Sequence, residues 1–203
     1  MLYYYMNEKI KLSVLGFSFN QAKTGAYGLV LAEEGSMRRL MVIVGTPEAQ
    51  AIAFKLQDIP PPRPLTHDLI QSLMQEFDLK LIETNIYKYK DGIFYSKLLI
   101  EKDNCIVEVE SRTSDAVGVA LRMNAPIYTN EQIMQEIGVV FEENQMAENV
   151  EAKPELSLSV DYSLLSSTEL NIMLNDAIEG EDYELASILR DEIDKKKKSD
   201  EER

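Results

Sequence analysis

The chain has 203 residues and a net charge of −14, and it contains one histidine and one cysteine. This length allows one domain with a sizeable core and an appendage, and the lone Cys105 excludes an internal disulfide. One Cys and one His cannot supply the four ligands of a structural zinc site. No apolar run approaches the roughly 18 residues of a membrane span, and the start lacks the features of a signal peptide. We therefore predict a cytoplasmic protein without a membrane partner.

The acidic excess is unevenly distributed along the chain. Residues 1–141 carry 14 basic and 17 acidic side chains, residues 142–162 carry 1 and 6, and residues 163–203 carry 6 and 12. A strongly acidic protein repels nucleic acid at long range. The first segment is nearly neutral, however, so it can still hold a local basic site for a nucleic-acid partner.

The first part of the chain predicts a small sheet followed by two helices. Alternating apolar residues favour strands over 9–15, 27–32 and 40–44, the last two joined by a turn at 33–36. Thr46 is expected to cap a helix that has Pro47 at its first position. Thr66 is expected to cap a second helix, which places His67 and Asp68 in its first turn.

The next part predicts a second set of similar elements. Strands are expected over 79–87, 93–101 and 106–110. The last of these runs into a helix with Thr113 or Ser114 as its N-cap and Asp115 in its first turn. A short helix capped by Asn130 and a strand over 139–141 close the domain.

An offset of 67 residues relates the two sets and predicts a duplicated unit of strand, strand, strand and helix. The matching pairs include Gly25 and Gly92, Leu31 and Leu98, Thr46 and Thr113, Ala49 and Ala116, and Ala53 and Ala120. The predicted fold class is α+β, with helices packed on the sheet. The copies differ in charge, because the positions of Met41, Ile43 and Gly45 hold Glu108, Glu110 and Arg112 in the second copy. The second copy is thus expected to carry the function.

A linker and a helical hairpin are expected after the domain at 1–141. Residues 142–162 are acidic and polar, which indicates a flexible linker. Residues 163–203 show two apolar stripes at helical spacing, separated by a break at 179–182. Two short helices bury too little surface to be stable alone, so the hairpin is expected to pair with a protein partner, its own domain or a second copy. We predict a homo-oligomer.

The N-terminus of the helix after Arg112 is a candidate anion site. Arg112, the hydroxyls of Thr113 and Ser114 and the free N–H groups of the first turn are expected to converge on one point. Such a point suits phosphate or a carboxylate. The alternative is structural, because Arg112 can instead pair with Asp115 or Asp68.

Two further candidates have equally ordinary alternatives. His67 with Asp68 suits an acid/base and its orienting carboxylate, or else reflects simple helix-start chemistry. Glu108 and Glu110, with Asp115, offer oxygen ligands for Mg²⁺ or Mn²⁺, which phosphodiester cleavage commonly uses. Alternating glutamates are otherwise typical of a solvated strand face.

Three separated motifs resemble the bifunctional nuclease family, which is described as cleaving RNA and DNA. They are Arg-Pro-Leu-Thr-His-Asp-Leu at 63–69, Asp-Gly-Ile-Phe-Tyr at 91–95, and Val-Glu-Ser-Arg-Thr-Ser-Asp-Ala at 109–116. The resemblance covers about residues 8–141. It implies the following motif positions as functional residues: Arg63, Thr66, His67, Asp68, Arg112, Ser114 and Asp115.

The C-terminal hairpin resembles a second known motif. Tyr183-Glu-x-Ala-x-x-Leu-Arg-Asp-x-Ile193, within residues 163–198, is similar to the UVR motif of excision-repair nuclease subunits. That resemblance implies an antiparallel hairpin that binds protein partners. It does not indicate which partner.

The two resemblances lead to two hypotheses. The first is a nuclease that hydrolyses phosphodiester bonds, with His67 as acid/base, Arg63 and Arg112 on phosphate, and Asp68, Asp115 or Glu110 on a metal or as orienting groups. The second is a non-enzymatic adaptor that binds an anionic ligand or a protein. An open cleft at the motif residues favours the nuclease, whereas burial of His67 and Arg112 in closed pairs favours the adaptor.

Overall fold

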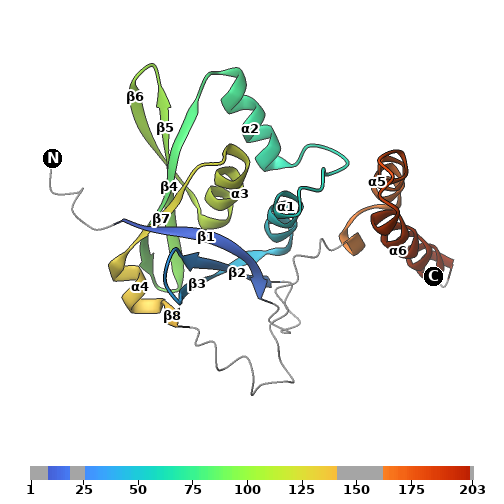
Figure 1. Ribbon diagram of the computed structural model, residues 1–203, viewed down its shortest axis with the longest axis horizontal. Coiled ribbons are helices and arrows are strands. Elements are labelled where there is room, and N and C mark those ends of the chain that lie inside the picture. Colours follow the sequence, from blue (N-terminus) through green and yellow to red (C-terminus); the bar gives the residue numbers. More distant parts are fainter. Residues whose placement is uncertain (1–8, 19–25, 141–161, 202–203) are drawn as a thin grey trace.

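The computed structural model describes residues 9–18, 26–140 and 162–201. In these residues, eight strands form one mixed sheet with helices packed against it, which confirms the α+β class (Figure 1). The sheet order is β6-β5-β4-β7-β1-β2-β3-β8. The strands are β1 (Lys9–Ser18), β2 (Ala26–Glu33), β3 (Arg38–Gly45), β4 (Lys80–Lys90), β5 (Ile93–Lys102), β6 (Cys105–Arg112), β7 (Ile127–Asn130) and β8 (Val139–Val140).

The duplication is visible in the topology. β1, β2 and β3 run outward on one side of β7, and β4, β5 and β6 run outward on the other side. β3 and β6 differ by 67 at both ends, and so do helices α1 (Thr46–Leu56) and α3 (Thr113–Met123). β7 joins the two copies, because it pairs parallel to β4 and antiparallel to β1.

The helices cover the apolar face of the sheet. β3 alternates, with Leu40, Val42 and Val44 buried and Met41 and Ile43 exposed. α1 packs against α3, which in turn contacts β4, β5 and helix α2 (Thr66–Glu76). Ala116, Val117, Val119 and Ala120 of α3 are fully or almost fully buried in the core. The first turn of α3 is therefore held in place by a helix that is packed into the core.

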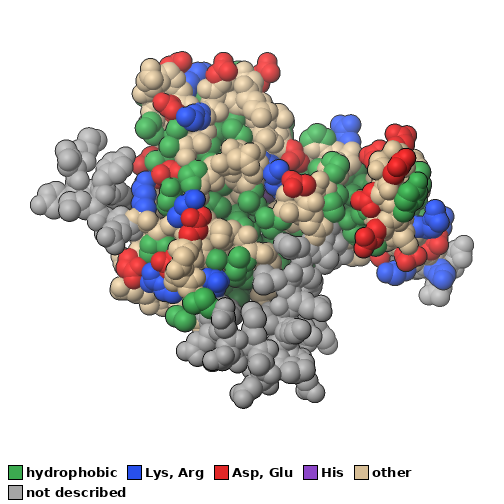
Figure 2. All heavy atoms as spheres, viewed as in Figure 1, with side chains coloured by type: hydrophobic (Ala, Val, Ile, Leu, Met, Phe, Trp, Pro, Cys, Tyr) green, Lys and Arg blue, Asp and Glu red, His purple; other side chains and the backbone are tan. Residues whose placement is uncertain are grey.

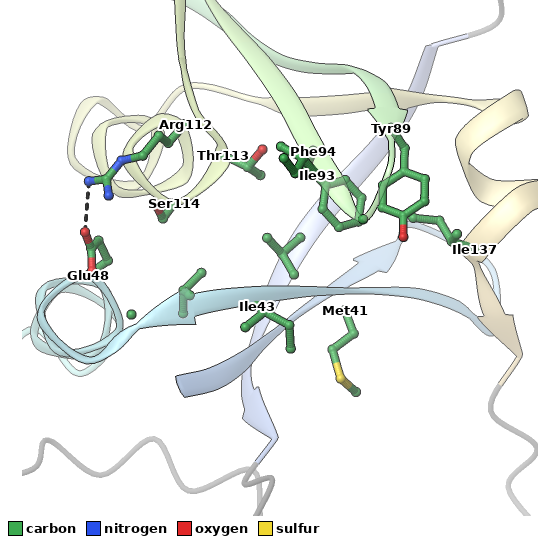
Figure 3. Close-up of a pocket in the computed structure, with 14 residues that line it drawn as sticks. Met41, Ile43, Glu48, Tyr89, Ile93, Phe94, Arg112, Thr113, Ser114 and Ile137 are labelled. Atoms are coloured by element: carbon green, nitrogen blue, oxygen red, sulfur yellow. Dashed lines mark ion pairs between the residues drawn. The ribbon is translucent and has the colours of Figure 1, made fainter. Parts of the chain in front are cut away.

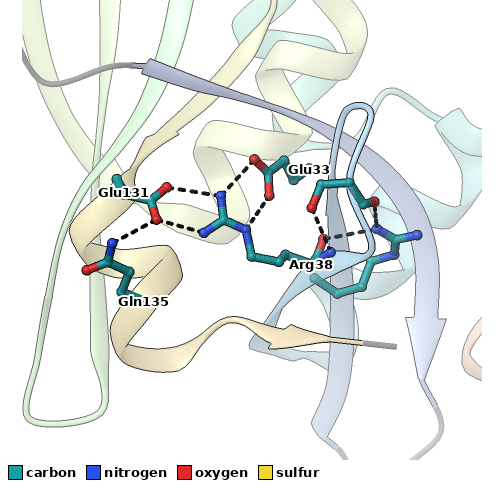
Figure 4. Close-up of polar contacts among 6 residues, drawn as sticks. Glu33, Arg38, Glu131 and Gln135 are labelled. Atoms are coloured by element: carbon teal, nitrogen blue, oxygen red, sulfur yellow. Dashed lines mark hydrogen bonds and ion pairs between the residues drawn. The ribbon is translucent and has the colours of Figure 1, made fainter. Parts of the chain in front are cut away.

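The C-terminal part of the domain is held to the first copy by Arg38, which lies between two carboxylates (Figure 4). Arg38 Nε donates to Glu33 Oε2 at 2.6 Å, and Arg38 Nη1 donates to Glu131 Oε1 at 2.8 Å. Glu131 opens helix α4 (Glu131–Ile137), which leads into β8 beside β3. The hydrogen bonds from Arg38 lower the pKa of both carboxyls below their usual range.

We expect Arg38→Ala to lower the thermal stability near neutral pH and to remove part of its acid dependence. A carboxyl with a lowered folded pKa adds stability above its unfolded pKa and loses it as pH falls. The wild type should therefore lose stability below the ordinary glutamate value of 4.5, and the variant should lose less over that range. Thermal melts across pH would measure both slopes.

Lys55→Ala is the matched control for this comparison, because Lys55 forms an ion pair with the exposed Asp58 at a helix end. An exposed pair of this kind contributes little to stability. If the stability of Arg38→Ala and of the wild type falls equally steeply with decreasing pH, the role given to Arg38 and its two carboxylates is wrong.

The C-terminal region forms the expected hairpin. Helix α5 (Ser167–Glu179) packs against helix α6 (Tyr183–Glu201), and Leu170, Met173, Ala177, Leu189 and Ile193 are buried. A short 3-10 turn (Tyr162–Leu164) precedes it. On the face in view, acidic side chains gather over both helices (Figure 2). The predicted linker at 142–162 lies outside the described residues except for Tyr162. Among the described helices, none combines the length and the apolar character needed to cross a membrane.

Candidate functional site

The N-termini of α2 and α3 meet at a hydrogen bond. His67, in the first turn of α2, places Nε2 3.2 Å from Oδ1 of Asp115 in the first turn of α3. The two motif segments therefore meet at their helix starts, although His67 is 48 residues away from Asp115 in the chain. The helix dipole favours an acidic residue in the first turn. Here the acidic residue, Asp115, is also hydrogen-bonded to a side chain of the neighbouring helix.

His67 itself is enclosed. Only 3% of its surface is exposed, and its ring lies flush against Gly118 of α3. A Cβ on Gly118 would lie 2.9 Å from the ring, so the close approach requires glycine. Within the described residues, Nδ1 has no hydrogen-bond partner. Among the described residues, the hydrogen bond that the imidazole makes is thus the one between Nε2 and Asp115.

Arg112 is the outer member of the group. It ends β6 and is the N-cap residue of α3, and 67% of its side chain is exposed. Its Nε donates to Asp115 Oδ2 at 2.7 Å, and its Nη2 lies 2.8 Å from Oε1 of Glu48 in the first turn of α1. Glu48 is the counterpart of Asp115 at the offset of 67, so one guanidinium joins equivalent carboxylates of the two copies. Glu48 was not predicted as a site residue from the sequence.

These contacts change the acidity of the group. Burial acts to raise the pKa of Asp115, but hydrogen bonds from Arg112 and His67 outweigh it and lower that pKa below its ordinary value. The same pairs raise the pKa of Arg112, first through Asp115 and then through Glu48. In this arrangement Asp115 is ionised and Arg112 is charged near neutral pH.

Asp68 belongs to a different group. Its Oδ2 accepts from the backbone N–H of Leu65 at 2.7 Å, and its Oδ1 accepts from Nε of Arg122. Arg122 is buried and also donates to the carbonyl oxygens of Gly118 and Ala51, each at 3.1 Å. This group therefore ties α1, α2 and α3 together. Arg122 was missed in the sequence because a basic residue in the last turn of a helix is ordinary.

The predicted hydroxyl positions are divided. Thr113 and Ser114 are buried at the start of α3, and the Thr113 hydroxyl lies 2.6 Å from Ser96 Oγ rather than capping the helix. Thr66, the first residue of α2, and Arg63, three residues before it, are both exposed. The predicted threonine caps are off by one residue. The helices begin at the threonines themselves, and the N-caps are the residues before them: Gly45, Leu65 and Arg112.

The glutamates of β6 have other partners. Glu108 Oε2 accepts from Lys97 Nζ at 2.7 Å, and Glu110 Oε1 accepts from the Tyr87 hydroxyl at 3.4 Å. No group of three or more His, Cys, Asp or Glu side chains in the described part of the chain is arranged to hold a metal ion. The described residues therefore do not fit a Mg²⁺ or Mn²⁺ site at Glu108 and Glu110.

A cavity of about 440 Å³ lies beside Arg112 (Figure 3). Glu48, Arg112 and Ser114 lie at one side of it, and Tyr89 and Ile137 lie at the opposite side. Between them the walls come from β3 of the first copy and from β5 and the turn before it in the second copy. The complete lining is Met41, Val42, Ile43, Val44, Gly45, Glu48, Tyr89, Gly92, Ile93, Phe94, Arg112, Thr113, Ser114 and Ile137.

Comparison with known proteins agrees with this architecture. Residues 29–142 match the bifunctional nuclease domain, and residues 168–199 match the UvrB/uvrC motif. Uncharacterized proteins from two strains of Mycobacterium tuberculosis are 38% identical over 112 residues, which is 55% of this chain and 66% of each relative. The match thus spans somewhat less than two thirds of those relatives. Because the nuclease-domain match covers more than half of the chain, the chain belongs to the bifunctional nuclease domain family, and its hairpin carries a UvrB/uvrC motif.

Proposed function

We propose that this chain hydrolyses phosphodiester bonds of nucleic acid at the group formed by Glu48, Arg112 and Asp115, and that its hairpin recruits a protein partner. The observation that carries the proposal is the exposed guanidinium of Arg112, which is held by two carboxylates at the edge of a cavity. Exposed ion pairs are weak and exchange readily. A phosphate that approaches from solvent can therefore take over the guanidinium, to which it binds in a bidentate manner.

Binding of phosphate would also change Asp115. The hydrogen bond from Arg112 is the main influence that holds the pKa of Asp115 down, whereas burial acts to raise it. Once Arg112 turns to the phosphate, burial has more weight and Asp115 becomes a better proton acceptor. The acid/base role then falls on Asp115, which is partly exposed, rather than on the enclosed His67.

The reaction can be written on these residues. A water between Asp115 and the bound phosphate gives a proton to Oδ2 of Asp115 while its oxygen forms a bond to phosphorus, and the bond from phosphorus to the leaving ester oxygen breaks. The leaving oxygen takes a proton from solvent. Arg112 neutralises the charge that builds up on the phosphoryl oxygens, and His67 Nε2 keeps Asp115 oriented through Oδ1.

The hairpin provides the second half of the proposal. Its buried stripe is used within the pair of helices, yet Ile172, Ile178, Tyr183 and Ile188 stay exposed. Apolar side chains on this small acidic module offer a contact surface for a protein partner or a second copy of the chain. The homo-oligomer remains part of the proposal on this ground.

An adaptor function is the second candidate, and the enclosure of His67 favours it. With His67 buried against Gly118 and Arg112 paired with two carboxylates, the group can act purely to join α1, α2 and α3. In that case anions bind weakly or not at all.

Two substitutions that act in opposite directions separate these candidates. We expect Arg112→Ala to weaken binding of single-stranded nucleic acid by roughly tenfold to a hundredfold and to abolish cleavage, because a charged hydrogen bond to phosphate is lost. Glu48→Gln should tighten binding, because it removes a carboxylate that competes with phosphate for Arg112. Fluorescence anisotropy and a cleavage assay on the full chain, with and without EDTA, would measure both.

Arg190→Ala is the control, because it removes an exposed positive charge from the hairpin. Cleavage that persists unchanged in Arg112→Ala would come from elsewhere or from a contaminant and would sink the nuclease proposal. Unchanged binding in both site variants would move the assignment to the adaptor.

A further inference from the structure

The cavity beside Arg112 is divided into a charged side and an apolar side. The apolar side contains two aromatic rings, Tyr89 and Phe94, with centroids 4.9 Å apart and planes tilted by 54°. Met41 and Ile43 face them from β3 across the cavity (Figure 3). Met41, Ile43 and Ile93 are exposed although they are large and apolar, so water covers them in the free chain.

Both copies of the duplicated unit contribute side chains to the cavity. β3 of the first copy supplies Met41 and Ile43, whereas β6 and α3 of the second copy supply Arg112 and Ser114. The equivalents of Met41 and Ile43 in β6 are Glu108 and Glu110, which cannot form an apolar wall. The duplication has therefore produced one composite cavity with a cationic edge and an apolar interior.

We infer that the apolar side of this cavity is a nucleobase subsite, which accepts one unstacked base of a single strand while Arg112 holds the adjacent phosphate. Aromatic and aliphatic walls suit the flat faces of any base, and stacking of this kind tolerates different sequences. The volume of about 440 Å³ is within the roughly 300–1,000 Å³ range of small-ligand sites. The inference rests on the proposed function for the phosphate contact and adds the class of substrate.

The subsite implies a preference for single strands. A base in a duplex is paired and stacked, and it must be turned out before it can enter a side pocket, which costs a few kcal/mol. A base in a single strand can enter without that cost. A duplex carries phosphates at a higher density than a single strand, so a cationic group such as Arg112 by itself favours the duplex. A preference for the single strand therefore comes from the apolar side.

Two isoleucines of nearly equal exposure allow a matched test. Ile43 lines the cavity and is 63% exposed, and Ile106 lies on β6 outside the cavity and is 59% exposed. We expect Ile43→Ser to weaken binding of a single-stranded deoxythymidine oligonucleotide by roughly fivefold, whereas Ile106→Ser leaves it unchanged. The affinity of the full chain would be measured by fluorescence anisotropy. Because both side chains are largely exposed, neither change should prevent folding.

Three probes locate the effect. The oligonucleotide, an abasic strand of equal length and a duplex of the same sequence are compared on the wild type and on Ile43→Ser. The subsite predicts that the wild type binds the oligonucleotide more tightly than the other two, and that Ile43→Ser removes this advantage without weakening the abasic strand. Phe94→Leu, which keeps an apolar side chain but removes a ring, should weaken binding of the oligonucleotide alone by roughly fivefold or more.

The outcomes distinguish this inference from the proposed function. Equal affinity of the wild type for the oligonucleotide and the abasic strand, with Arg112→Ala weakening both, would overturn the nucleobase subsite and leave the phosphate site intact. If Arg112→Ala weakens none of the probes, the proposed function fails, and the subsite fails with it because its phosphate anchor is absent. If Ile106→Ser weakens binding of the oligonucleotide as much as Ile43→Ser does, the subsite is also overturned.

Discussion

Arg122→Ala is expected to destabilise the domain by about 3–5 kcal/mol, which is the usual cost of removing one partner from a buried ion pair. The Arg122 side chain is only 2% exposed, and it is hydrogen-bonded to Asp68 and to the carbonyl oxygens of Gly118 and Ala51. Its loss leaves a partly buried carboxylate without its cation, two carbonyls without a donor and a cavity between three helices. Urea unfolding of the full chain, followed by circular dichroism, would measure the change.

A double-mutant cycle gives this prediction its control. Asp68→Asn alone removes the charge but keeps a group that can accept from the N–H of Leu65, so a smaller loss is expected. Arg122→Ala combined with Asp68→Asn should lose less stability than the sum of the two single changes, because no stranded charge remains. Strict additivity would show that Arg122 acts by filling space and not by pairing with Asp68.

The duplicated part of the fold could be predicted from sequence because both copies repeat the same local patterns. β3 with α1 and β6 with α3 follow the offset of 67 without a gap. β7, by contrast, was not predicted. It has only four residues, and its place between β4 and β1 depends on pairing with segments more than forty residues away. A strand this short gives too little periodicity to recognise.

The candidate site was predicted in part for a similar reason. Arg112 and Asp115 are three residues apart, so their pairing follows from local helix geometry. Glu48 and the apolar wall of Met41 and Ile43 belong to the other copy, and only the tertiary fold brings them to Arg112. Gly45 shows how close the two copies come at this site. It is the first-copy counterpart of Arg112 and lines the same cavity. A Cβ at Gly45 would lie 2.6 Å from Glu48 Oε2.

Asp115→Asn should lower cleavage by roughly 10²- to 10⁴-fold, the range for loss of a general base, while binding of nucleic acid is kept or slightly improved. Asparagine cannot take the proton from water, yet its Oδ1 can still accept from Nε2 of His67. It also removes a carboxylate that competes with phosphate for Arg112. Cleavage rates under single-turnover conditions, together with anisotropy on the same samples, would separate the two effects.

His67→Gln tests the competing assignment, in which His67 is the acid/base. Glutamine can donate one hydrogen bond to Asp115 but cannot exchange a proton near neutral pH, so a positioning role predicts a loss of less than about tenfold. The pH profile of kcat/KM is the sharper measurement. If Asp115 is the base, the acid limb of that profile is still present in His67→Gln, because the group that titrates remains. If the acid limb disappears and the rate falls as far as in Asp115→Asn, the imidazole carries the proton, and the enclosed geometry around Gly118 must open for the reaction to occur.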